Sequence, residues 1–226
     1  VINGDKESNT ASSAGAVYVF ERTGKDWSNP AYIKPTNTGA GDWFGRSVAM
    51  SADGGTLAVG APNERSDATG VGAQQSDNSI EEAGAVYMFV RTDKWSQQEY
   101  IKASNTEAYD NFGQSVALSA DGDMLAVGAA GEDSSAAGIA GSQTDNFAAA
   151  AGAVYMFTRA LDVWSQKAYV KAPNAAQTDY FGHSVAVSGD GDVLAVGAFG
   201  EESTAIRIGG DQKNNTAPDA GAVYFY

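Results

Sequence analysis

The feature that most constrains the fold of this chain is an internal repeat of 68 or 69 residues. The motif Ala-Gly-Ala-Val-Tyr occurs four times, with its central glycine at Gly15, Gly84, Gly152 and Gly221. The motif Phe-Gly-x-Ser-Val-Ala occurs three times, starting at Phe44, Phe112 and Phe181. Self-similarity at a fixed period is typical of architectures that stack like units. The chain therefore holds about three and a third copies of one supersecondary unit.

Each copy contains four short segments of the kind that forms β-strands. Residues 100–102, 115–119, 125–129 and 153–157 are rich in small, β-branched and aromatic residues and are bounded by Gly, Asp, Asn and Ser. No segment keeps a helical period over about ten residues. Four antiparallel strands repeated in tandem predict an all-β fold made of β-propeller blades. A β-solenoid is the rival fold, less favoured because its rungs are usually much shorter.

The positions of the motifs divide the chain into blades of a single propeller region, residues 1–226. We predict a partial blade at 1–43, full blades at 44–111 and 112–180, and a second partial blade at 181–226. A closed propeller needs about four to eight blades, so this array cannot close alone. Three explanations stay open: a piece of a longer protein, copies joined edge to edge in a ring, or copies stacked into a filament.

Composition excludes several function classes. The net charge of −14 argues against nucleic acid and against an anionic membrane surface, because both need clustered Lys and Arg. No apolar run approaches the roughly 20 residues that a membrane-spanning helix needs, so we expect no membrane insertion. The chain has no cysteine, which excludes disulfides, cysteine-based zinc sites and cysteine nucleophiles.

The only histidine, His183, stands beside Ser184 in a sequence that resembles a hydrolase nucleophile elbow. The repeat argues against catalysis, because the positions equivalent to His183 hold Arg46 and Gln114. An elbow also requires a turn from strand to helix, whereas the sequence here predicts a strand and a hairpin. We therefore expect no enzyme, and a hydrolase is only the third functional hypothesis.

The long loops between the second and third strands contain recurring oxygen-bearing residues. These are Glu64, Glu132 and Glu201, the asparagines Asn9, Asn78, Asn146 and Asn215, and the aspartates Asp77 and Asp145. One interpretation is a calcium site, because a glutamate and an Asp-Asn pair supply the oxygens that Ca²⁺ prefers. The other is that the asparagines adopt left-handed turns and order the loops by side-chain hydrogen bonds.

Two further polar positions recur in every copy that contains them. An aspartate stands two residues before each Phe-Gly, at Asp42, Asp110 and Asp179. We expect an Asx turn or a backbone cap there, with ligand binding as the alternative. A lysine recurs at Lys34, Lys102 and Lys171, where we expect a solvated or ion-paired residue on the outer strand.

The motifs resemble the FG-GAP repeat, which builds the N-terminal propeller of integrin α subunits. Phe-Gly-x-Ser-Val-Ala followed by Val-Gly-Ala-Pro at residues 59–62 carries this resemblance. The Gly-Ala-Val-Tyr segment and the long loops are more similar to the FG-GAP variety of bacterial secreted and surface proteins. The calcium loop of integrin repeats is cut here to tight hairpins at residues 51–56, 119–124 and 188–193, so the integrin calcium sites do not carry over.

The resemblance implies a function in binding, adhesion or display. We expect a non-enzymatic extracellular or cell-surface module for binding, adhesion or structural assembly. Its partner would be a protein or glycan bound through the long loops, with a homo-oligomer or filament formed by edge-strand pairing as a further expectation. The alternative is a calcium-dependent carbohydrate- or protein-binding propeller.

Overall fold

A computed structural model of the chain describes residues 2–8 and 10–226. Its described residues form strands, turns and loops and contain no helix. The strands are antiparallel and form successive small sheets in chain order. The prediction of an all-β fold is therefore confirmed.

Two of the sheets are complete four-stranded blades. The first contains β5 (Ser47–Met50), β6 (Thr56–Ala61), β7 (Ala85–Arg91) and β8 (Trp95–Ile101). The second contains β9 (Phe112–Leu118), β10 (Met124–Ala129), β11 (Ala153–Ala160) and β12 (Val163–Val170). In both blades the strands lie side by side in chain order.

Partial blades flank this pair. On the N-terminal side β1 (Val17–Val19) pairs with β4 (Ala31–Ile33), and the connection between them forms the short hairpin of β2 (Arg22–Thr23) and β3 (Asp26–Trp27). On the C-terminal side β13 (Ser184–Val187), β14 (Leu194–Ala198) and β15 (Ala222–Phe225) form a three-stranded sheet.

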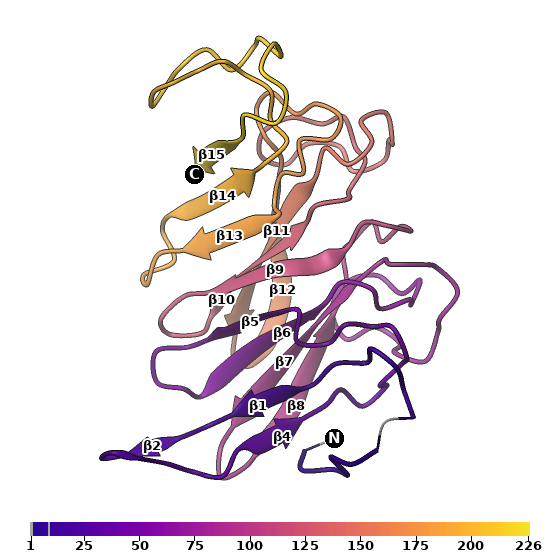
Figure 1. Cartoon of the computed structure of the whole chain (residues 1–226), viewed down its shortest axis with the longest axis vertical. Helices are drawn as coiled ribbons and strands as arrows, with labels where there is room; N and C mark the ends of the chain where they lie inside the picture. Colours follow the sequence, from indigo (N-terminus) through magenta and orange to yellow (C-terminus); the bar gives the residue numbers. More distant parts are fainter. Residues whose placement is uncertain (1, 9) are drawn as a thin grey trace.

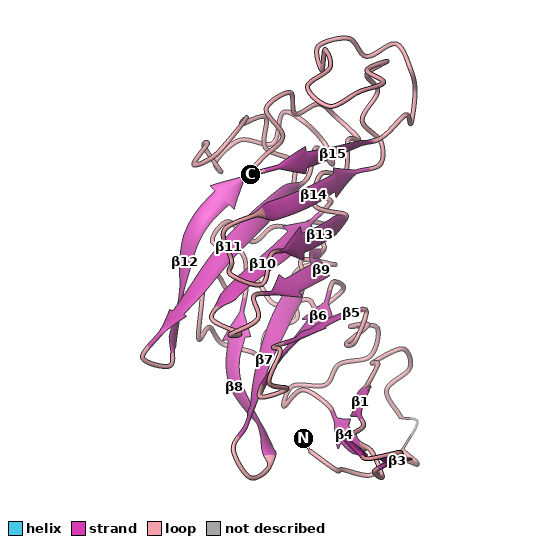
Figure 2. Cartoon of the chain, turned by 90° about the vertical axis from the view of Figure 1, so that its left-hand side faces the viewer, coloured by secondary structure: helices cyan, strands magenta, loops and turns pink. Residues whose placement is uncertain are grey.

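The sheets follow one another along the long axis of the molecule, from the N-terminus to the C-terminus (Figures 1 and 2). The tight hairpins between the first and second strands lie on the left in Figure 1, and loops 62–83 and 130–151 project on the right. The hairpins turn at Gly54, Gly122 and Gly191, where φ is +69°, +76° and +82°, a region that favours glycine. The described strands form an open array, as expected for an incomplete propeller.

The hydrophobic core lies between successive blades. Val86 and Met88 of β7 face the second blade and pack in one cluster with Phe112, Tyr155 and Phe157. The third strands of the two complete blades are buried on both faces for this reason, and all of Ala85 to Phe89 is inaccessible to solvent. This two-sided burial explains why the third strand reads as a continuous apolar run instead of an alternating one.

Blades approach closely where the Phe-Gly motif of one blade meets the second strand of the blade before it. A Cβ placed on Gly60 would lie 2.0 Å from the carbonyl oxygen of Gly113. The Ser47 hydroxyl donates to that same carbonyl at 2.8 Å, and the Ser115 hydroxyl donates to the Gly182 carbonyl at 2.8 Å. The serine of the Phe-Gly-x-Ser motif is therefore an interblade donor.

Candidate functional site

The most prominent polar cluster at the base of each long loop is built around a buried carboxylate. Glu64, Glu132 and Glu201 each follow the second strand of a blade and are each 1% exposed. Burial of a carboxylate at this level is rare unless the group is paired or hydrogen-bonded. The partners of these three glutamates therefore define the chemistry of the site.

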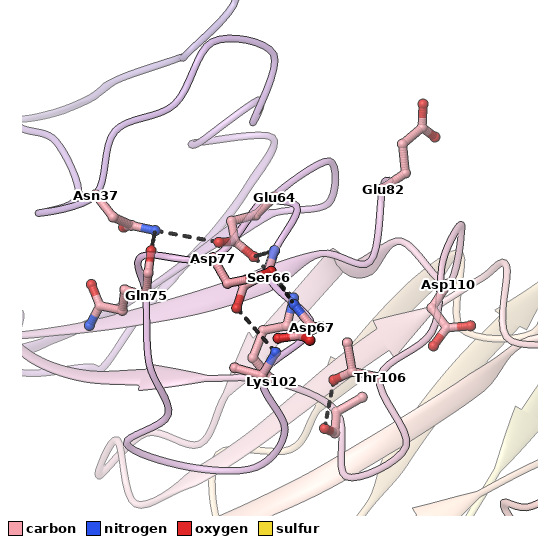
Figure 3. Close-up of polar contacts among 12 residues, drawn as sticks. Asn37, Glu64, Ser66, Asp67, Gln75, Asp77, Glu82, Lys102, Thr106 and Asp110 are labelled. Atoms are coloured by element: carbon pink, nitrogen blue, oxygen red, sulfur yellow. Dashed lines mark hydrogen bonds and ion pairs between the residues drawn. The ribbon is translucent and has the colours of Figure 1, made fainter. Parts of the chain in front are cut away.

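In the first complete blade, Glu64 forms a buried ion pair with Lys102 (Figure 3). The Lys102 Nζ lies 3.0 Å from Glu64 Oε2, and Lys102 itself is fully buried. The backbone N–H of Ser66 donates to the same Oε2 at 3.1 Å. Lys102 directly follows β8, so the pair links the second and fourth strands of one blade.

The second oxygen of Glu64 is held by the segment that leads into the blade. The Asn37 side-chain amide donates to Glu64 Oε1 at 3.4 Å and to the Gln75 carbonyl at 3.0 Å. The Tyr87 hydroxyl donates to Asn37 Oδ1 at 2.8 Å, which fixes the amide. In Figure 3, Glu82 points away from this group and Asp110 lies apart from it.

The second complete blade repeats the arrangement around Glu132. Lys171 Nζ lies 2.7 Å from Glu132 Oε2, and both side chains are buried. Asn105 donates to Glu132 Oε1 at 3.2 Å. The Ser134 hydroxyl donates to Oε2 at 3.2 Å and lies 2.6 Å from the Tyr169 hydroxyl. The lysine, the asparagine and the serine N–H recur around the carboxylate in both blades, which indicates a structural unit that belongs to the blade.

Electrostatics accounts for the tightness of these pairs. Burial lowers the pKa of Lys102 and of Lys171, and the neighbouring glutamate acts in the opposite direction in each case. Removing either partner would leave a buried charge without compensation. Because their oxygens accept from the blade and from the segment that leads into it, Glu64 and Glu132 anchor the loop and do not face solvent.

The third copy of the cluster contains the carboxylate without the lysine. The Ser203 N–H and hydroxyl donate to Glu201 Oε2 at 3.1 and 3.0 Å, and Asn174 donates to Oε1 at 3.0 Å. The Tyr224 hydroxyl donates to Asn174 Oδ1 at 2.7 Å. Within residues 2–8 and 10–226, no lysine or arginine forms an ion pair with Glu201.

The aspartates of the long loops make hydrogen bonds of their own. Asp77 accepts from the N–H of Ser79 at 2.8 Å, and Asp145 accepts from the N–H of Ser135 at 2.8 Å. These bonds order the loop through the aspartates. The left-handed turns predicted for the asparagines are not found at Asn78, Asn146 or Asn215, because none of the three has a positive φ. The described part of the chain has no group of three or more Asp, Glu, His or Cys side chains placed to hold a metal ion.

The loop asparagines lie at the surface. Asn78, Asn146 and Asn215 are exposed, and Asn146 donates to the Glu107 carboxylate. Asn9 lies outside the described residues. Calcium binding by these loops stays a prediction. The glutamates at the loop bases accept hydrogen bonds from lysine, asparagine or serine, and the aspartates accept theirs from backbone N–H groups within the loops.

His183 and Ser184 lie at the start of β13. The His183 ring contacts the ring of Phe199 edge-on, with centroids 4.8 Å apart, and Phe199 stacks on Tyr180 at 4.7 Å. Ser184 begins a strand and aligns with the interblade donor Ser47. The residues following it form a strand and a hairpin, as the sequence predicted.

Sequence reasoning missed the burial of the lysines. We expected Lys102 and Lys171 to be solvated or ion-paired on the outer strand; they are ion-paired, but in the interior. The signal that could have found them is joint recurrence. In both complete blades a glutamate follows the second strand and a lysine follows the fourth, at separations of 38 and 39 residues. The aspartates before Phe-Gly are also buried, and Asp110 accepts from the Glu107 N–H at 2.9 Å as a backbone cap.

Comparison with known families supports the same repeat unit. A family model described as FG-GAP repeat matches residues 27–89, 95–157 and 164–226. The matches begin at Trp27 of β3, Trp95 of β8 and Trp164 of β12, and the first two end within the third strands β7 and β11 of the next blade. No curated protein matched the chain. Among the described residues, no helix is long and apolar enough to cross a membrane. The three matches cover most of the chain, which therefore belongs to the FG-GAP repeat family.

Proposed function

We propose that the chain is a non-enzymatic binding and assembly module, secreted or displayed at the cell surface, that contacts a protein or glycan through its long loops. The propeller-type repeat supports a binding or structural role, although fold alone does not fix a function. The location outside the cell rests on the resemblance to secreted and surface FG-GAP proteins.

The observation that carries the proposal is the exposure of large apolar side chains on otherwise polar loops. Phe147 is 81% exposed and Ile206 is 98% exposed, and both belong to the long loops between second and third strands. Apolar side chains surrounded by polar residues are typical centres of protein and ligand contacts. The buried ion pairs at the loop bases support this role, because they fix the loops in place.

The proposal is tested by binding measurements on a glycan array and on immobilised collagen, fibronectin and laminin. Phe147→Ser and Ile206→Ser should reduce binding to any ligand that the wild type captures. The matched control is Leu161→Ser, since Leu161 is 99% exposed but lies in the hairpin between β11 and β12. Equal binding by all four proteins, or turnover of ester substrates that Ser184→Ala abolishes, would contradict the proposal.

A further inference from the structure

A groove of about 650 Å³ lies between the two complete blades, on the side of their long loops. Its lining includes Val71 of loop 62–83, Gln143 of loop 130–151 and Gln166 of β12. Ser104, in the segment that joins the two blades, also lines it. Both blades and both loops therefore contribute to one groove, whose size is typical of sites for small ligands.

The polar side chains of this groove are almost all neutral. Of the described residues that line it, only Lys167 carries a charge. The Ser104 hydroxyl donates to Gln143 Oε1 at 2.6 Å. This bond fixes the carbonyl end of the amide, so the Gln143 side chain offers N–H donors at its other end. The groove is thus equipped for hydrogen bonds with an uncharged ligand.

Gln166 supplies an acceptor that has no donor among the described residues. Its Oε1 is buried and accepts no hydrogen bond from them. In the first blade the equivalent Gln97 Oε1 accepts from the Thr36 N–H at 3.2 Å. Ser104 is equivalent to Thr36, but its hydroxyl is bonded to Gln143. A buried acceptor without a donor is costly, which favours a ligand that brings a donor to Gln166.

Backbone groups along the groove are already paired. The Ala140 N–H donates to the Tyr169 carbonyl at 2.8 Å, and both residues line the groove. On the side of the first blade, the Lys102 N–H donates to the Gly70 carbonyl at 2.9 Å. A peptide that binds by strand addition needs free backbone groups, whereas these are occupied. Recognition in this groove therefore depends on side chains.

We infer that the groove binds a neutral oligosaccharide through Ser104, Gln143 and Gln166. The inference rests on the proposed function and names the class of glycan. A sugar hydroxyl both donates and accepts, so it can donate to Gln166 Oε1 and accept from the Gln143 amide. The last torsion of a glutamine side chain is broad, which lets Oε1 turn toward such a donor. Val71 and Ala168 supply apolar surface for the C–H faces of the sugar ring, and the net charge of −14 disfavours an anionic ligand.

The test titrates maltotriose, cellotriose and mannotriose calorimetrically into the whole chain. We expect saturable binding of at least one trisaccharide, with a dissociation constant of about 1 mM or lower. Gln166→Met should weaken this binding about fivefold or more, because the ligand loses its acceptor. The same substitution should not lower the melting temperature, since the acceptor that it removes has no partner to lose. A fall in affinity without a fall in stability therefore identifies a role in binding.

The matched control changes the equivalent glutamine of the first blade. Gln97 is not among the residues that line the groove, so Gln97→Met should leave trisaccharide binding unchanged. Excess chelator should also leave it unchanged, because none of the described residues that line the groove is a carboxylate. Equal affinities of the wild type and Gln166→Met, or an equal loss in Gln97→Met and Gln166→Met, would overturn the inference.

The groove and the proposed function can fail separately. Phe147 does not line the groove, so Phe147→Ser should weaken the capture of immobilised ligands without weakening trisaccharide binding. If no trisaccharide binds up to about 10 mM while capture depends on Phe147, only the inference is overturned. If trisaccharide binding depends on Gln166 while capture does not depend on Phe147, the inference stands and the proposed loop contact fails.

Discussion

At the scale of single residues, the molecule depends on charges that are buried with their partners. Lys171 and Glu132 form a buried pair. The Asn105 amide and the N–H and hydroxyl of Ser134 donate to the same carboxylate, and the Tyr155 hydroxyl donates to Asn105. Such pairs contribute little net stability over an apolar substitute, but a broken pair is expensive. The consequences of changing one partner are therefore larger than those of changing both.

We expect Lys171→Met to lower the free energy of unfolding by about 3–5 kcal/mol, because Glu132 is left buried and uncompensated. The double variant Lys171→Met, Glu132→Gln should recover part of this loss. Lys167→Met is the control, because Lys167 is exposed on the same strand and should change stability by less than about 0.5 kcal/mol. Urea denaturation monitored by tryptophan fluorescence gives the three values. Equal losses for Lys171→Met and Lys167→Met would show that the pair is not closed in solution.

Asp110 predicts an unusual dependence of stability on pH. Burial, with the nearby carboxylates of Glu132 and Glu107, raises the pKa of Asp110 to about 8, while the hydrogen bond from the Glu107 N–H acts against this. The folded state therefore retains a proton between about pH 4 and pH 8 that the unfolded state releases. Its contribution to stability is present at low pH and is lost as the pH rises through 8.

Asp110→Asn keeps an acceptor for the Glu107 N–H and removes the ionisation. The free energy of unfolding of the variant minus that of the wild type should rise by about 1–3 kcal/mol from pH 5 to pH 9. Asp121→Asn is the control, because hydrogen bonds from Ser119 and Asp123 lower the pKa of Asp121 and its effect should not vary over that range. Thermal unfolding at both pH values measures the difference, and parallel pH profiles for wild type and Asp110→Asn would contradict the assignment.

At the scale of strands and loops, the contact between neighbouring blades depends on backbone approach as much as on side chains. A Cβ on Gly128 of β10 would lie 1.9 Å from the Gly182 carbonyl oxygen. The equivalent Gly197 of β14 meets only the Ser184 hydroxyl, at 2.4 Å, which can rotate away. The same motif therefore has a different tolerance in different blades.

We expect Gly128→Ala to lower the free energy of unfolding by about 2 kcal/mol more than Gly197→Ala does, because only Gly128→Ala forces two backbones apart. Differential scanning calorimetry of the two variants checks this ordering. Equal melting temperatures would mean either that the blades separate easily at the 128–182 contact, or that another blade covers Gly197 in solution.

The long loops also carry a prediction about calcium. Any calcium site there would have to form without Glu64 and Glu132, which are engaged by lysine. We expect the melting temperature in millimolar calcium and in excess chelator to agree within about 1 °C, because a ligand stabilises only the state that binds it. A larger shift, abolished by Asp77→Asn with Asp145→Asn, would establish the calcium-dependent alternative.

At the scale of the whole molecule, stability should behave as a sum over like units and their interfaces. Deleting residues 112–180 would join Asn111 to Phe181 in phase with the repeat. We expect a folded β-protein with a lower melting temperature, measured by circular dichroism, because one interblade interface is lost. A deletion of the same length that begins at residue 120 cuts through the β9–β10 hairpin but rejoins the repeat in phase, so it should give a similar product. Aggregation of both products would show that the interfaces are not interchangeable.

Much of this architecture could be predicted from the sequence, because the repeat fixes strand order and the identity of each turn. The pairing of Glu64 with Lys102 could not, because the two residues are 38 positions apart and a charged residue in isolation predicts a solvated surface.

The donation from serine in one blade to glycine in the next has a direction, and this gives the stack a polarity. Each interface reuses one pair of complementary surfaces, with the hydroxyl always on the preceding blade. A gene segment duplicated in phase would therefore add a blade that already matches both of its neighbours. Lengthening such a protein needs no new interface to evolve, whereas reversing a single blade would leave every hydroxyl and carbonyl at its borders without a counterpart.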